Sequence, residues 1–202
     1  MGYKENAAGS TTAPYVVTLG TAGGPRWWTD NQGQPRQGIA TAVVVEDGWY
    51  LVDCGSGVGR QIRSAGLSMV DLKGIFITHM HSDHIVDLAS LMLFAPFEIK
   101  DSQKPPIPIF GPGRRGRIPP MSPRPQSTPE PDNPNEPGAG IESTFAGLVS
   151  AFSADFNDRM RDSLTPGPYD HFAPHDIEIP ETVHFDPDEN VAPEMDPLVV
   201  FQ

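Results

Sequence analysis

The sequence predicts an α/β fold on three observations. Short runs of β-branched and aromatic residues recur along the first 113 residues, bounded by glycine, proline and asparagine, as is typical of strands. Between them lie stretches whose apolar residues follow helical spacing. A group of histidines directly follows one apolar run, and α/β proteins place their sites at such strand ends. The 202 residues suffice for one domain with a core, or for part of a larger one.

The expected strands alternate with glycine-rich turns. Tyr15–Leu19 ends at Gly20, and residues 20–38 are rich in Gly, Pro, Asn and Gln and predict a loop. The Asp47-Gly48 pair between two apolar runs favours a hairpin. The remaining strand candidates are Gly74–Thr78 and Ile107–Phe110, then more weakly Ile177–Ile179, Val183–Phe185 and Leu198–Phe201.

Three stretches predict helices, and one stretch excludes regular structure. Val58–Ala65, Ile85–Phe94 and Ile141–Arg161 carry apolar residues at helical spacing. Residues 105–137 hold 12 of the 23 prolines, which favours a long surface loop over 114–140. Residues 1–14 have the composition of a disordered tail.

Charge and composition limit the binding partners and the cellular location that we expect for this chain. The net charge is −12; residues 1–129 carry 12 Lys/Arg against 10 Asp/Glu, whereas residues 130–202 carry 2 against 16. Because such an acidic segment repels polyanions, nucleic acid is disfavoured as a partner. No run of 18 apolar residues is present, so no membrane span is expected, and the N-terminal residues lack the apolar core of a secretory signal. We therefore expect a cytoplasmic protein, with its one cysteine, Cys54, as a buried structural thiol.

Four metal-competent side chains fall within six residues. Thr78 is followed by His79, then by His81, Asp83 and His84. Imidazole nitrogens and carboxylate oxygens bind zinc and similar divalent ions. Residues two apart on a strand share a side, so His79 and His81 can converge on one ion, and a turn can aim the next two at a second ion. An isolated histidine is usually a surface or core residue, but that explanation does not account for this grouping.

The segment His79-Met80-His81-Ser82-Asp83-His84 matches the HxHxDH signature of the metallo-β-lactamase superfamily. The segments TLGTAGGP, WYLVDCGSG, RQIRSAGLSMVDLKGIFITHMHSDH and IPIFGPG resemble its ribonuclease Z-like and arylsulfatase-like branch, over residues 15–113. The resemblance implies an αβ/βα sandwich, of which the chain looks like the N-terminal half. After this half we expect a Pro-rich insertion and then an acidic helical or irregular segment at 141–202. That segment begins the second half of the same domain.

By this resemblance His79 and His81 bind the first metal, and Asp83 and His84 bind the second, with Asp83 also the catalytic carboxylate. Zinc is the expected cofactor, two ions in the complete site, although manganese or iron suits the same ligands. Asp53 matches a family aspartate that supports a ligand histidine; its alternative role is a strand-end turn residue. The family's later ligands have no clear match: His171 and His175 lie in a Pro-flanked acidic segment, and the spare candidate His184 also fits a solvent-facing strand residue.

The resemblance implies a metal-dependent hydrolase that uses a metal-bound hydroxide on an ester-type small molecule: a phosphodiester, a sulfate ester or a lactone. One alternative is a truncated, non-catalytic metal-binding fragment, because the missing ligands predict an inactive isolated chain. Another is an RNA-processing nuclease. A half-sandwich would expose apolar surface, so a homo-oligomer is also expected.

Two further groups have open roles. Trp27 and Trp28 either wall a substrate pocket or anchor their loop on the core. Arg114, Arg115 and Arg117 either contact a phosphate or sulfate ester or form a solvated loop.

Overall fold

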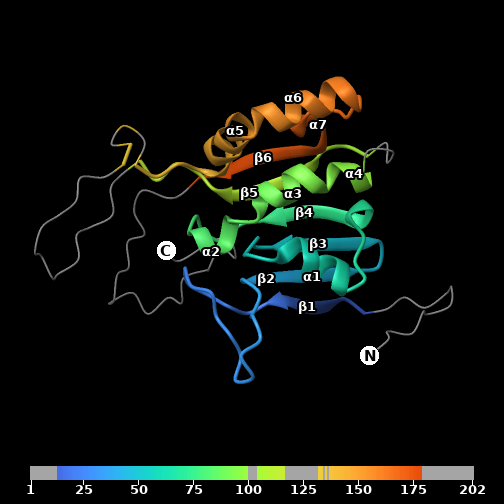
Figure 1. The fold of residues 1–202 in the computed structure, drawn as a ribbon, viewed down its shortest axis with the longest axis vertical. Coiled ribbons are helices and arrows are strands. Elements are labelled where there is room, and N and C mark those ends of the chain that lie inside the picture. Colours follow the sequence, from blue (N-terminus) through green and yellow to red (C-terminus); the bar gives the residue numbers. More distant parts are fainter. Residues whose placement is uncertain (1–12, 100–103, 117–131, 134, 136, 179–202) are drawn as a thin grey trace, which may run out of the picture.

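A single six-stranded sheet organises the computed structural model, which describes residues 13–99, 104–116, 132–133, 135 and 137–178 (Figure 1). The strands follow one another across the sheet in chain order. They are β1 (Tyr15–Gly20), β2 (Ala40–Val45), β3 (Gly48–Val52), β4 (Leu72–Phe76), β5 (Ile107–Pro112) and β6 (Phe172–Ile177). The mixed architecture of strands and helices confirms the α/β prediction.

The first three strands form an antiparallel meander. Thr41 pairs with Val52 and Val45 with Gly48 across the hairpin. The residues between the last pair are Glu46 and Asp47, so the turn lies one residue earlier than the Asp47-Gly48 turn that the sequence predicted. Gly48 opens β3 instead.

From β3 onward the pairings are parallel, so each strand is joined to the next by a helical crossover. The carboxyl ends of β3, β4, β5 and β6 therefore share one edge of the sheet. The crossovers contain α1 (Val58–Ser64) with the 3₁₀ turn η1 (Met69–Asp71), then α2 (Ser82–Ile85), α3 (Leu88–Phe94) and α4 (Pro96–Ile99), and finally α5 (Ile141–Ala151), α6 (Ser153–Asp162) and α7 (Pro168–His171).

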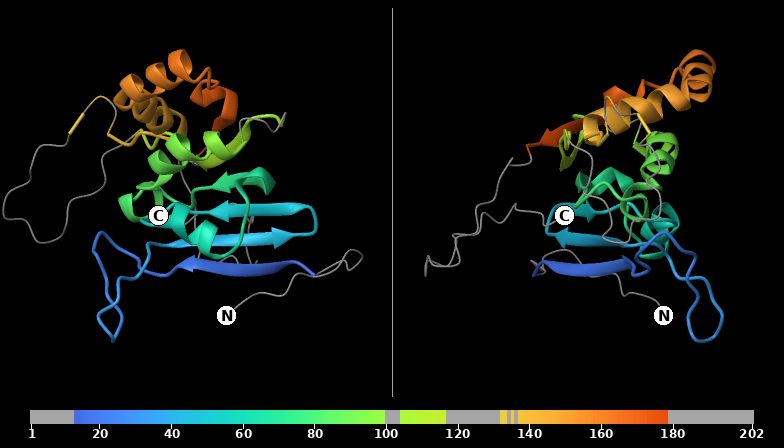
Figure 2. Two further views of the ribbon diagram at one scale, coloured as in Figure 1. Left: turned by 45° about the vertical axis from the view of Figure 1, so that its right-hand side comes forward. Right: turned by 90° about the vertical axis from the view of Figure 1, so that its left-hand side faces the viewer.

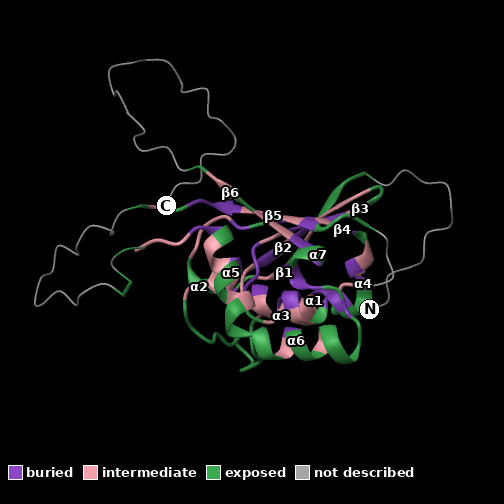
Figure 3. Cartoon of the chain, turned by 90° about the horizontal axis from the view of Figure 1, so that it is seen from above, coloured by how far each residue is buried: buried purple, intermediate pink, exposed green. Residues whose placement is uncertain are grey.

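The helices lie on one side of the sheet, and the core lies between the two layers (Figure 3). Alternate residues of the strands point into it because successive side chains of a strand face opposite ways. The buried set combines strand residues with the apolar faces of α1, α3 and α5; it includes Trp49, Leu51, Ile75, Ile109, Phe172, Val58, Ile62, Leu88, Met92, Ile141 and Phe145.

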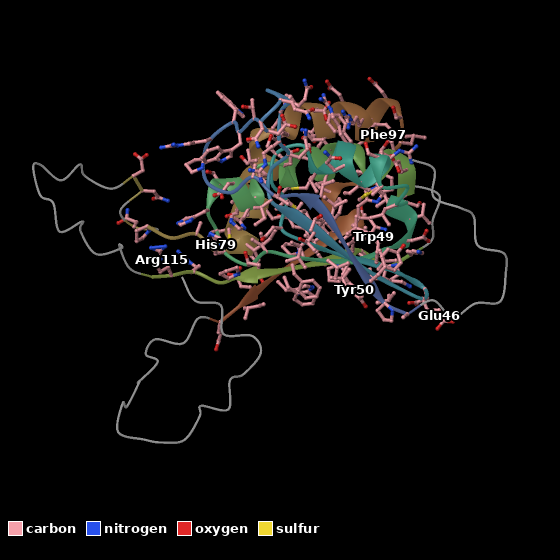
Figure 4. The ribbon with its side chains drawn as sticks, turned by 90° about the horizontal axis from the view of Figure 1, so that it is seen from below. Glu46, Trp49, Tyr50, His79, Phe97 and Arg115 are labelled. Atoms are coloured by element: carbon pink, nitrogen blue, oxygen red, sulfur yellow. The ribbon has the colours of Figure 1, made fainter. Side chains whose placement is uncertain are left out.

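The other face of the sheet carries a row of rings, one from each of four neighbouring strands. The ring centres of Tyr50 and Phe76 lie 6.0 Å apart, those of Phe76 and Phe110 5.4 Å, and those of Phe110 and His175 5.1 Å. Tyr50 and Trp49, neighbours on β3, point to opposite sides (Figure 4). None of the described helices covers this row, and Phe76 remains 36% exposed.

Two predicted helices are interrupted in the structure. The stretch 141–161 breaks at Phe152, whose backbone (φ −104°, ψ 20°) leaves the helical region between α5 and α6. Phe145 in α5 and Phe156 in α6 are both buried, one on each side of the break. The stretch 85–94 breaks between α2 and α3, where Asp87 adopts a non-helical conformation.

Several predictions fall wholly or partly outside the described residues. These are most of the tail at 1–14, most of the loop at 114–140, and the spare metal-ligand candidate His184. The strand candidates Val183–Phe185 and Leu198–Phe201 also lie outside the described residues, as does the last residue of Ile177–Ile179. None of the described helices is long and apolar enough to cross a membrane.

Candidate metal centre

The predicted metal ligands lie at the edge where β3 and β4 end. Asp53 directly follows β3, and His79 comes three residues after β4. The Asp53 N–H donates to the Phe76 carbonyl at 2.8 Å, which extends the parallel pairing of the two strands by one residue. His79 and Arg115 lie at this edge, and Glu46 lies at the opposite one (Figure 4).

Asp53 connects the two strand ends through its carboxylate. Oδ1 accepts from the Thr78 N–H at 2.9 Å and lies 3.0 Å from Thr78 Oγ1, while Oδ2 lies 2.8 Å from His84 Nδ1. Its backbone is left-handed (φ 64°), a conformation that aspartate adopts more readily than most residues. The residue is 4% exposed, so these bonds are shielded from water. The carboxylate thus bonds to residues 25 and 31 positions away and not to its local backbone, and its support of a metal-binding histidine stays a prediction.

The four candidate ligands form two pairs. His79 Nε2 lies 3.1 Å from His81 Nδ1, and His84 Nε2 lies 3.4 Å from Asp83 Oδ2. Two donors bound about 2 Å from one tetrahedral ion are separated by roughly 3.3 Å. Both separations therefore suit a shared divalent ion. No three such donors form a ready cage within the described part of the chain, so the fit is of two donors to each ion.

The surroundings favour the protonation states that metals bind. Burial lowers the pKa of His79, and the neighbouring His84 and His81 lower it further. Burial alone would raise the pKa of Asp83, but the Gly24 N–H, the residue's own backbone and the nearby histidines outweigh it, and the net shift is downward. A neutral imidazole and an ionised carboxylate are the forms that coordinate a divalent ion.

Two positioning groups escaped the sequence analysis. Thr78 fills the centre of the cluster: its Oγ1 lies 3.1 Å from His79 Nδ1 and 3.3 Å from His84 Nδ1, besides its contacts with Asp53. The Gly24 N–H donates to Asp83 Oδ2 at 2.5 Å and ties the loop after β1 to the site. A signal for Gly24 was present in the glycine turn of TLGTAGGP, whereas nothing in the sequence separated Thr78 from an ordinary strand residue.

The other histidines lie elsewhere. His171 is buried at the end of α7, and its Nε2 has no hydrogen-bond partner among the described residues. His175 is exposed on β6 and stacks on Phe110. Cys54 is fully buried next to Asp53, and burial, followed by the charges of Asp53 and Asp87, strongly raises the pKa of its thiol, as suits a structural residue.

Comparison with known proteins matches this part of the chain. The family model described as Anti-Pycsar protein Apyc1 matches residues 41–110. A ribonuclease Z from Pseudomonas putida is 50% identical over 62 residues, which are 30% of this chain and 19% of that protein. A ribonuclease Z from Thermoplasma acidophilum is 35% identical over 97 residues, 48% of this chain and 29% of the relative. The aligned part thus spans under a third of these relatives.

The structure of the short form of human tRNase Z superposes with a TM-score of 0.51 and 20% identity, covering 84% of this chain and 47% of that one. The fold therefore resembles that of a metallo-β-lactamase-type protein. Over the aligned residues the chain is similar to ribonuclease Z, in agreement with the sequence resemblance.

These relatives correct one prediction. The acidic composition led us to disfavour nucleic acid as a partner, but the matched proteins are named ribonuclease Z and tRNase Z. The error was to let a charge summed over 73 residues stand for the charge at the site. The loop 21–38, which reaches Asp83, holds Arg26 and Arg36 against a single acid, Asp30.

Proposed function

We propose that this chain supplies metal-binding residues of a hydrolase that cleaves a phosphodiester bond in RNA. The observation that supports it most is the pairing of donors: His79 with His81, and His84 with Asp83, each at the separation of two ligands on one ion. The ribonuclease Z relatives favour RNA over the sulfate esters and lactones considered from the sequence. RNA as substrate also suits the cytoplasmic location suggested by the sequence.

Zinc suits these donors, with manganese or iron as alternatives. Bound ions would lower the pKa of a water and polarise the phosphorus–oxygen bond. The protein's own groups fix the donors. If His84 donates its Nδ1 proton to Asp53, its Nε2 lone pair points toward Asp83, the proposed catalytic carboxylate. Catalytic zinc sites take about three protein ligands, so each ion needs donors beyond these pairs.

Metal binding is tested first. Equilibrium dialysis against zinc should load the wild-type chain, and His79→Ala/His81→Ala should bind less. His175→Ala is the matched control, because it removes an exposed histidine from the sheet without touching the cluster. Equal zinc content in wild type and double variant would contradict the assignment.

Cleavage is tested on a single-stranded RNA whose scissile position carries a single 2′-deoxy substitution. An attacking water does not need the 2′-hydroxyl, so metal-dependent cleavage should persist on this substrate, whereas a contaminating nuclease that forms a cyclic phosphate should fail. The double variant should lose the activity. Cleavage that the double variant retains would refute the proposal. Metal binding without cleavage would instead favour the non-catalytic alternative.

A further inference from the structure

The loop between β1 and β2 is held in shape next to the metal centre. Within it, the Arg36 N–H donates to the Trp28 carbonyl and the Asp30 N–H to the Gln34 carbonyl, both at 2.8 Å. It projects from the body of the fold (Figure 2). Its base is fixed by the bond from Gly24 to Asp83. Because Trp27 lies only three residues along the chain from Gly24, the loop holds Trp27 close to the candidate metal centre.

The two tryptophans of the loop have different surroundings. The Trp28 indole N–H donates to the Gly23 carbonyl at 2.7 Å, and the Arg26 guanidinium lies 5.8 Å from its ring centre, so this ring stabilises the loop. The neighbouring Trp27 is 98% exposed. A packed tryptophan buries about 150–250 Å², and Trp27 gains almost none of this from its own chain. The anchoring role left open by the sequence therefore applies to Trp28 and not to Trp27.

The charges around Trp27 favour a polyanion. Arg26 precedes it, and Arg36 is held at the base of the loop through Thr21, with bonds of 2.9 and 2.7 Å to the carbonyl and hydroxyl. The one acid of the loop, Asp30, accepts from the N–H groups of Gln32 and Gln34 through Oδ1, so its charge is partly used within the loop. Trp27 is thus an exposed ring in a loop that carries two guanidinium groups, and single-stranded nucleic acids stack their bases on exposed aromatic rings in positively charged surroundings.

We infer that Trp27 is a stacking platform for one unpaired base of the RNA whose phosphodiester lies at the metal centre, with Arg26 contacting the adjoining phosphate. This inference rests on the proposed function. It identifies the substrate region as single-stranded, because a base in a duplex has no free face to stack on Trp27. It also predicts little base preference, since every base offers a π-face.

The test measures binding and needs no turnover. A dye-labelled single-stranded RNA of about 12 nucleotides, within the site size of such surfaces, is titrated with the full chain in buffer without divalent metal, and fluorescence anisotropy is followed. Trp27→Ala should weaken binding by between about fivefold and a hundredfold, the effect of losing one stacked base. Trp27→Phe should retain most of the affinity. Phe94→Ala, which removes another exposed ring at the end of α3, should bind like wild type.

A second titration uses RNAs with one abasic position moved along the strand. Wild type should lose affinity at one position, and Trp27→Ala should not distinguish that RNA from the intact one. Absence of RNA binding by wild type, equal binding by Trp27→Ala, or an equal loss for all RNAs would overturn the inference. So would a changed self-association of Trp27→Ala with unchanged RNA binding, which would make the ring a protein contact.

The proposed hydrolase function and the proposed stacking role of Trp27 can be refuted independently of each other. RNA binding through Trp27, together with equal zinc content in wild type and in His79→Ala/His81→Ala, would support the platform and contradict the metal-binding role. Cleavage with kcat/KM unchanged in Trp27→Ala would support the hydrolase and overturn the platform.

Discussion

Replacement of Asp53 by asparagine separates the folding role of this residue from its effect on the metal centre. The amide oxygen of asparagine can still accept from the Thr78 N–H, now 2.9 Å from Oδ1, and asparagine tolerates a left-handed backbone (φ 64°). The amide nitrogen, however, would face His84 Nδ1 across the present 2.8 Å. Because a donor cannot pair with a donor, His84 should move its proton to Nε2.

With its proton on Nε2, His84 has no free lone pair for a metal on the nitrogen that lies 3.4 Å from Asp83 Oδ2. Loss of an outer partner of a metal-binding histidine usually costs about 10- to 100-fold in metal affinity, or roughly 1.4–2.7 kcal/mol. The cost in folding free energy should be smaller, about 1 kcal/mol, since one neutral bond replaces a charge-assisted one. Asp53→Ala differs, because it leaves the Thr78 N–H without its acceptor and His84 Nδ1 with only Thr78 Oγ1 at 3.3 Å, and it should cost roughly 1–3 kcal/mol.

Zinc affinity is measured by competition with a chromophoric chelator, stability by urea unfolding, and the His84 tautomer by long-range ¹H–¹⁵N correlation. Asp170→Asn is the matched control, because Asp170 accepts from the Gly167 N–H at 2.8 Å in α7, which leads into the amino end of β6, at the edge opposite the candidate ligands. Its zinc affinity should equal that of wild type. Wild-type zinc affinity in Asp53→Asn, with His84 protonated on Nε2, would refute the reasoning.

Three further predictions concern the core. Cys54 should resist Ellman's reagent at pH 8 until urea unfolds the chain, because burial raises the pKa of its thiol; rapid labelling of folded protein would contradict this. Burial lowers the pKa of His171 in the folded state, so the unfolded chain binds the proton first, and stability should decline as the pH falls below about 6.5. Urea midpoints at pH 7 and 5 should differ less in His171→Phe than in wild type. Phe145 is buried, so Phe145→Ala should lower the free energy of unfolding by about 3–5 kcal/mol. Phe152 is half-exposed, so Phe152→Ala should lower it by under about 1 kcal/mol. Equal losses in the two variants would contradict the difference in burial.

The sequence predicts well what is local. The four candidate ligands fall within six consecutive positions, so their closeness in space, though not their role, follows from the sequence. The hairpin of β2 and β3 depends on one turn and also requires no knowledge of distant contacts. β6 was harder to predict, because Pro174 argues against a strand. Among the described strands β6 pairs with β5 alone, at the sheet edge, where a missing N–H costs little.

The contacts at the centre of the candidate site could not be predicted from the sequence, because they join residues that are distant along the chain. The carboxylate of Asp53 meets Thr78 and His84 only because β3 and β4 pair in parallel, and residues 25 and 31 positions apart in the chain carry no local sign of such contact. The charge of the Trp27 loop was likewise hidden in the near balance of residues 1–129, which carry 12 Lys/Arg against 10 Asp/Glu.

The parallel crossover between β3 and β4 also sets the order in which the site can assemble. The meander of β1, β2 and β3 involves neighbouring segments and a two-residue turn, whereas the contact between Asp53 and His84 closes a loop that contains α1 and η1. Contacts distant in sequence pay their closure entropy before they stabilise the chain, and they tend to form late. In a refolding intermediate whose only folded part is the meander, the candidate ligands at 79–84 would still lie on unfolded chain, and His84 would not be oriented by Asp53. Zinc added during refolding should therefore associate with the kinetics of β4 docking, which makes the metal a reporter of when the parallel half of the sheet forms.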